Sequence, residues 1–330
     1  IINMNLLKPF LISAFLIVLY GCNVTHLQAQ ALKLPDNGAN YKCLTGRTIG
    51  LTDIEIRWNA PGVKGREGKI WGDLVYYGFS VLGYGSNVES PWRAGADECT
   101  TISFSTDVSI NGKKLPAGKY GFFIAVYPDS CILIFNKNTE GWGSYFYNQA
   151  LDVLRVTTRQ IKELPVSTER LEFIFNNQTS HSVEVALRWE RWQIPFNVEI
   201  DLNSTILASI RTQLSSGLGF DPPSLEAGAQ WCLDNNINFE EALNWINSAT
   251  NPSLGGVRTF KTLSTHAGLL EKTGRKVNAD KMMAEAIELG GPIDLHLYGR
   301  KLISQKKYAE AMDVFDKNFT KHKGIWPTHV

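Results

Sequence analysis

Apolar and polar residues alternate along residues 48–202 with a period of two, the spacing of strands that bury one face. Turn signals interrupt the alternation, and Asn111-Gly112 is typical of a tight hairpin. We expect Ile102, Phe104, Val108 and Ile110 to share one face of a single strand before that hairpin. Many short strands separated by turns predict an antiparallel β-sandwich or a jelly-roll-like domain.

The spacing becomes helical at Asn203, which is a candidate N-cap for a helix that ends near Gly217. Asp221-Pro222-Pro223 then reads as a hinge. Asn238 with Glu241 has the spacing of a capping pair. Beyond the hinge, small and large residues recur as in tetratricopeptide-like hairpins. The clearest repeat contains Leu295, Gly299, Leu302, Tyr308, Ala311 and Phe315, and Phe315 should face its neighbouring helix.

These patterns predict an α+β multidomain chain with four parts. A signal segment (1–31) precedes the β-sandwich domain (32–202), and a helix and linker (203–223) lead to the tetratricopeptide-like helical hairpins (224–330). The last residues, from Trp326 to Val330, read like the start of another helix. We therefore expect a truncated array with an apolar strip at its end.

The first residues have the features of an export signal. Lys8 supplies a positive charge and residues 10–19 form an apolar run too short to span a bilayer. Ordinary cleavage after Ala29-Gln30-Ala31 would start the mature chain at Leu32, which is the favoured prediction. The alternative is lipoprotein processing with lipidation at Cys22, where Tyr20 is bulky for a lipobox. Both predict a periplasmic or outer-membrane location, with the membrane reached only through a lipid anchor.

Composition excludes several function classes. The 330 residues are 44% hydrophobic and carry a net charge of +1, which gives no basic footprint for nucleic acid. His181 is the only histidine in the predicted β-domain, so a histidine-based triad or metal site is not expected there. We expect no cofactor and no metal. Export permits disulfides, yet the cysteines show no paired spacing, and we expect free, mostly buried thiols at Cys43, Cys99, Cys131 and Cys232.

The strongest polar constellation is Arg93 with Asp97 and Glu98, in the sequence Ser-Pro-Trp-Arg-Ala-Gly-Ala-Asp-Glu. An Arg fork could hold a carboxylate or sugar hydroxyls while Glu98 serves as acid, base or acceptor. The alternative, which we favour, is an ion pair that ties this loop to the first strand.

Aromatic residues suggest a second candidate surface. Trp71, Tyr77, Trp92 and Trp142 lie in or near loop-like segments rich in rings. They could form a ligand platform, but a lid of rings over the core is the favoured interpretation.

Several segments together resemble the domain of unknown function 2911 family. They are residues 62–66, 70–75, 92–96, 101–105, 115–121, 134–137, 142–143 and 152–155. The resemblance covers residues 34–202 and implies export by Bacteroidota-type bacteria, often with tetratricopeptide-like helices behind the β-domain. It implies no reaction and no catalytic residues.

Three functional hypotheses follow. The favoured one is a binding scaffold of the bacterial envelope, whose helical hairpins hold a protein or peptide and whose β-domain holds a small ligand or glycan. The second is an envelope hydrolase acting on glycan or peptide through Glu98 and Asp97 with Arg93, and the third is a purely structural envelope protein. A raised pKa at an acid beside Arg93 would favour the hydrolase.

Overall fold

The computed structural model describes residues 40–323. The predicted signal segment with Cys22 and Leu32, and the terminal stretch with Trp326 and Val330, lie outside the described residues.

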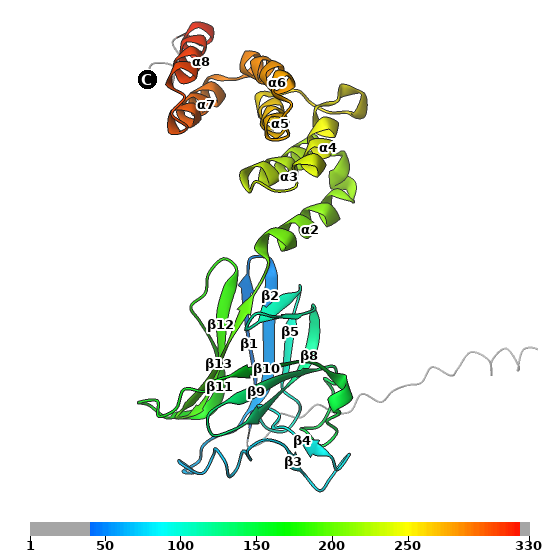
Figure 1. The fold of residues 1–330 in the computed structure, drawn as a ribbon, viewed down its shortest axis with the longest axis vertical. Helices are drawn as coiled ribbons and strands as arrows, with labels where there is room; N and C mark the ends of the chain where they lie inside the picture. The colour runs from blue at the N-terminus through cyan, green and yellow to red at the C-terminus, as the bar shows by residue number, and fades with distance from the viewer. Residues whose placement is uncertain (1–39, 324–330) are drawn as a thin grey trace, which may run out of the picture. The chain divides into compact units, whose positions relative to one another are not determined.

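The strands form two antiparallel sheets (Figure 1). The larger sheet has the order β1-β2-β5-β8-β9-β10 and the smaller has the order β11-β12-β13-β6-β7, while β3 and β4 pair with each other. The bounds are β1 Tyr41–Ile49, β2 Thr52–Ala60, β3 Ser80–Val81, β4 Glu89–Ser90, β5 Thr101–Phe104, β6 Val108–Ile110, β7 Lys113–Leu115, β8 Gly118–Val126, β9 Cys131–Asn136, β10 Asp152–Thr158, β11 Thr168–Asn176, β12 Ser182–Glu190 and β13 Trp192–Glu199. The predicted α+β class with an antiparallel β-domain is confirmed.

A single apolar core lies between the two sheets. Ile54, Ile56 and Trp58 of β2 alternate into it, as the period of two requires. Phe122 of β8 lies at its centre and contacts the rings of Phe135, Phe173 and Phe196.

One strand prediction was wrong. Ile102 and Phe104 belong to β5 of the larger sheet, whereas Val108 and Ile110 belong to β6 of the smaller sheet. The chain crosses between the sheets over residues 105–107, so both pairs still face the same core. A common period cannot tell one long strand from two short strands that face each other. The hairpin at Asn111-Gly112 is confirmed, with φ values of 46° and 79°.

The larger sheet also buries part of its outer face. Phe123, Ala125 and Ile134 on that face form a second cluster with Cys99 and Tyr147, and Phe79 packs against it. The last seven residues of β8 are therefore all buried. The smaller sheet thus covers one side of this part of the larger sheet and loops cover the other, and the polar loop discussed below contributes Cys99 to that cover.

The four described cysteines are free, as predicted. Cys131 lies on β9 and Cys99 lies just before β5, and β8 runs between these two strands. Burial raises the pKa of the Cys99 and Cys131 thiols to about 12, so both stay protonated at neutral pH.

Helices follow the last strand (Figure 1). They pack in successive pairs, α3 with α4, α5 with α6, and α7 with α8. The bounds are α2 Leu202–Leu214, α3 Pro222–Asp234, α4 Phe239–Thr250, α5 Phe260–Lys272, α6 Lys276–Leu289, α7 Pro292–Ser304 and α8 Tyr308–Lys321, with short 3₁₀ turns η1 Gln149–Leu151, η2 Gly217–Phe220 and η3 Pro252–Leu254. Within the described residues, no helix is long and apolar enough to cross a membrane.

Two predicted caps differ from the structure. Asp201, not Asn203, caps α2, because its carboxylate accepts a hydrogen bond from the Ser204 amide at 3.0 Å. Asn238 precedes α4 with a φ of 56° and caps no backbone amide, and its side chain instead donates to the Glu241 carboxylate. The placement of Phe315 is confirmed: its ring occupies the space beside Gly299, where an added Cβ would lie 2.6 Å from ring carbons.

Candidate functional site

The predicted polar loop lies between β4 and β5 and is anchored to β8. Trp92 exchanges two backbone hydrogen bonds with Ile124, of 3.1 and 2.8 Å. Ala94 and Asp97 take left-handed φ values of 51° and 53°, which fold the loop tightly. Arg93, Asp97 and Glu98 are all half-buried on this loop.

Glu98 ties the loop to the first two strands. Its carboxylate pairs with Lys42 Nζ of β1 at 2.9 Å and accepts a hydrogen bond from Asn59 Nδ2 of β2 at 2.5 Å. Partial burial opposes ionisation, but the bonds from Lys42 and Asn59 outweigh it and lower the pKa of Glu98. Glu98 is therefore an ionised, paired carboxylate near pH 7.

This pairing predicts a pH effect on stability. Because the folded-state pKa of Glu98 lies below its ordinary value of 4.5, its contribution is present above that value and is lost as pH falls through the folded pKa. Wild type should lose more stability between about pH 5 and about pH 3 than Glu98→Gln does. Urea denaturation at several pH values measures this, and Lys42→Gln should behave like Glu98→Gln. Equal acid sensitivity in all three proteins would contradict the pairing.

Arg93 does not join the two acids as predicted. Within the described part of the chain, no ion pair connects Arg93 to Asp97 or Glu98. Asp97 accepts instead from Asn40 Nδ2 at 2.9 Å, and Arg93 Nη1 approaches the Asp97 backbone carbonyl at 3.5 Å. The Arg93 guanidinium carbon lies 6.0 Å from the ring centre of Tyr145.

The predicted aromatic residues do not form one surface. Trp92 is buried and Trp71 is half-buried, and their rings form a cluster with those of Trp189 and Trp192. Trp71 stacks flat on Trp192, with ring centres 4.7 Å apart. Trp92 is thus part of the core and Trp71 packs against it, whereas Tyr77 and Trp142 are exposed.

A buried polar network escaped the sequence reasoning. The Asp152 carboxylate accepts hydrogen bonds from Asn136, Tyr147 and Arg155, each at 2.7 Å, and Arg155 also donates to the Tyr147 hydroxyl at 2.8 Å. Burial, reinforced by the bond to Asp152, raises the pKa of Tyr147. The family resemblance was the one signal in the sequence that could have pointed to this network. Its segments contain Asn136, Asp152 and Arg155. Three donors engage the carboxylate, which favours a structural interpretation of the network.

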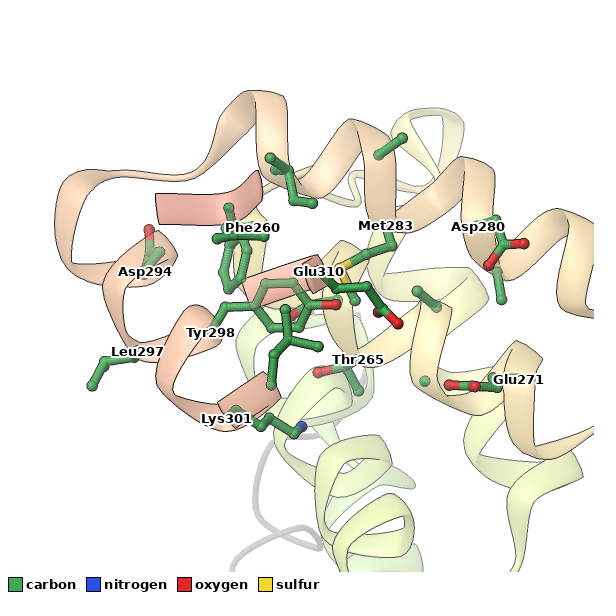
Figure 2. Close-up of a pocket in the computed structure, with 18 of the residues that line it drawn as sticks. Phe260, Thr265, Glu271, Asp280, Met283, Asp294, Leu297, Tyr298, Lys301 and Glu310 are labelled. Carbon is green, nitrogen blue, oxygen red and sulfur yellow. The ribbon is translucent and has the colours of Figure 1, made fainter. Parts of the chain in front are cut away.

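A groove with a volume of about 750 Å³ opens among the helices, and sequence reasoning named none of its residues as a site (Figure 2). Phe260 of α5, Met283 of α6 and Tyr298 of α7 gather around it. Charged residues of both signs line it as well. Glu226 of α3 is buried at its wall, where its carboxylate lies 2.6 Å from Lys261 Nζ and accepts from Thr265 at 2.9 Å.

The described residues contain no group of three or more His, Cys, Asp or Glu side chains placed to hold a metal ion. A comparison with curated proteins finds no match to the chain. Residues 42–198, which span nearly all of both sheets, match the model of a family described as a protein of unknown function (DUF2911).

Proposed function

We propose that the protein is an exported binding protein of the bacterial envelope, whose helical hairpins hold a segment of a partner protein in the groove of Figure 2. The observation that carries the proposal is the groove itself. Its volume of about 750 Å³ falls in the range of ligand sites, and it is lined from several successive helices. The tetratricopeptide-like spacing of the sequence supports the same use, because such arrays bind extended or helical peptides.

Two successive hairpins contact each other in the lining of the groove. Phe260 of α5 packs edge-on against Tyr298 of α7, with ring centres 5.9 Å apart. Gly290, in the turn between α6 and α7, packs against Leu295 and Phe260 and has no room for a side chain.

The chemistry of the lining suits an amphipathic segment. Met283, Tyr298 and Val314 offer apolar contact, while Glu271, Lys301 and other charged groups are interspersed with them. The acids and lysines along the groove are close to balanced in number, so we propose recognition by apolar anchors flanked by polar contacts rather than by one dominant charge.

The chemistry of the polar loop supports binding over hydrolysis. A general acid in a glycosidase or peptidase needs a raised pKa, and the pKa of Glu98 is lowered by its partners. Arg93 forms no ion pair with Asp97 or Glu98 in the described chain, so the predicted catalytic trio lacks its central contact.

Export rests on the sequence of residues 1–31 alone, and we propose the periplasm or outer membrane as the location.

Leu297 and Ile293 provide a matched test of the groove. Both are exposed apolar residues of α7, at 58% and 60%, but only Leu297 lines the groove. Leu297→Glu should reduce capture of partner proteins from envelope extract about tenfold or more, because a carboxylate would have to be desolvated against an apolar anchor. Ile293→Glu should capture as wild type does.

Quantitative mass spectrometry of proteins retained by each variant measures the effect. Equal retention by both variants, or equal loss in both, would contradict a binding role for the groove. Far-ultraviolet circular dichroism should show the same helix content in both variants.

A further inference from the structure

Two segments that carry aromatic side chains meet beside Arg93, where Tyr145 lies next to the guanidinium and Tyr84 contacts Tyr145. We call Tyr84, Trp142, Tyr145 and Phe146 the aromatic platform. Three of them are widely exposed: Tyr84 at 74%, Trp142 at 54% and Phe146 at 50%. Tyr84 comes from the tip of the β3–β4 hairpin, and the others come from the segment between β9 and η1. Exposed rings that two separate segments bring to one place favour an interaction surface.

The platform is built on backbone hydrogen bonds. The Ser86 amide donates to the Tyr145 carbonyl at 2.7 Å, and the Cys99 amide donates to the Gly141 carbonyl at 3.1 Å. Tyr84 and Tyr145 meet edge to face with ring centres 5.9 Å apart. Gly85 packs so closely against the Tyr145 backbone that no side chain fits there. These contacts therefore fix the two segments that carry the rings.

A hydrogen-bond donor and a hydrogen-bond acceptor both lie beside these rings. Arg93 lies beside the Tyr145 ring and against Gly143, whose φ of 60° and missing side chain make room for the guanidinium. The backbone of Glu98 forms a bridge to that of Trp142, and Lys42 and Asn59 hold the Glu98 carboxylate. Arg93 can only donate hydrogen bonds, and an ionised Glu98 can only accept them.

A sugar suits a surface that combines aromatic rings with a hydrogen-bond donor and a hydrogen-bond acceptor. A pyranose ring has a C–H face that lies on an aromatic ring, and its hydroxyls both donate and accept hydrogen bonds. Protein partners, in contrast, are anchored by aromatic residues that become fully desolvated in pockets. We propose that the aromatic platform binds pyranose units of an envelope glycan, with rings stacked on Trp142 and Tyr84 and hydroxyls bonded to Arg93 and Glu98. This site is separate from the helical groove and does not depend on it.

Affinity electrophoresis of the full chain tests the proposal. Native gels would contain a neutral glucan (hydroxyethylcellulose), an N-acetylated glycan (glycol chitin) or an acidic one (polygalacturonate), and a casein gel would serve as the protein arm. We expect at least one glycan to retard the wild-type chain. Trp142→Ala should weaken that binding about tenfold, as loss of a stacked ring does, and Arg93→Gln should also weaken it.

Two variants are controls for these changes. Phe220→Ala removes a strongly exposed ring outside the platform, and Arg191→Gln removes an exposed guanidinium that donates to the Leu164 carbonyl. Both should bind as wild type does. Because Trp142 is exposed, Trp142→Ala should keep the wild-type melting temperature, which separates lost binding from lost folding.

The glycan arms identify the source of the sugar. Retardation by polygalacturonate alone would assign an acidic glycan, and retardation by the uncharged gels would assign hydroxyl or acetamido recognition. No retardation in any glycan gel would overturn the proposal, as would retardation by casein alone. Equal weakening in Phe220→Ala and Trp142→Ala would overturn it too.

Discussion

Asp152→Ala is expected to lower the free energy of unfolding by about 3–5 kcal/mol, because it removes the acceptor of two buried donors and the ion-pair partner of Arg155. The Asp152 side chain is only 9% exposed and accepts from Asn136, Tyr147 and Arg155. Without the carboxylate, the Arg155 charge loses its ion-pair partner, and buried donors of Asn136 and Tyr147 lose their acceptors.

Urea denaturation of the full chain measures this difference. Asp129→Ala is the control, because Asp129 also forms an ion pair, with Lys162 at 3.2 Å, but its side chain is 93% exposed. That variant should differ from wild type by no more than about 1 kcal/mol. A similar small effect in Asp152→Ala would show that the network contributes little to folding.

Phe122→Ala should cost about 3–5 kcal/mol, because it removes a fully buried ring and leaves a cavity that the core fills only in part. The ring bridges the two sheets, since it contacts Phe135 of β9, Phe173 of β11 and Phe196 of β13. Helices beyond Leu202 have cores of their own, so the loss should appear in the unfolding of the β-region.

Near-ultraviolet circular dichroism of the aromatic residues, followed through a urea titration, reports that unfolding. Phe220→Ala is the size-matched control, because its ring is strongly exposed. A midpoint for Phe122→Ala equal to that of wild type would contradict the role of Phe122 as a bridge between the sheets.

The polar loop illustrates what sequence reasoning missed in the candidate site. The carboxylate of Glu98 was identified as an anchor of its loop, but its partners Lys42 and Asn59 lie 56 and 39 residues away along the chain. Local spacing favoured Arg93 as the partner because it is five residues away, whereas the structure turns Arg93 toward Tyr145. The Asp152 network and the residues that line the helical groove were missed for the same reason, since each set joins residues from different elements.

The sequence by itself determined the class of each region of this protein. Alternation with a period of two predicted strands up to residue 202, and the last strand ends at Glu199. Helical spacing predicted helices from Asn203, and α2 begins at Leu202, while Asn111-Gly112 specified a hairpin. Each of these features depends on local backbone preference and on which face of the element is apolar. Residues close together in the sequence set both properties. Tertiary structure alone decided that β5 and β6 lie in opposite sheets, that Glu98 pairs with Lys42, and that Tyr84 and Tyr145 from two segments meet beside Arg93. Those outcomes depend on long-range packing, because a period shows which side chains are buried but not which partners bury them.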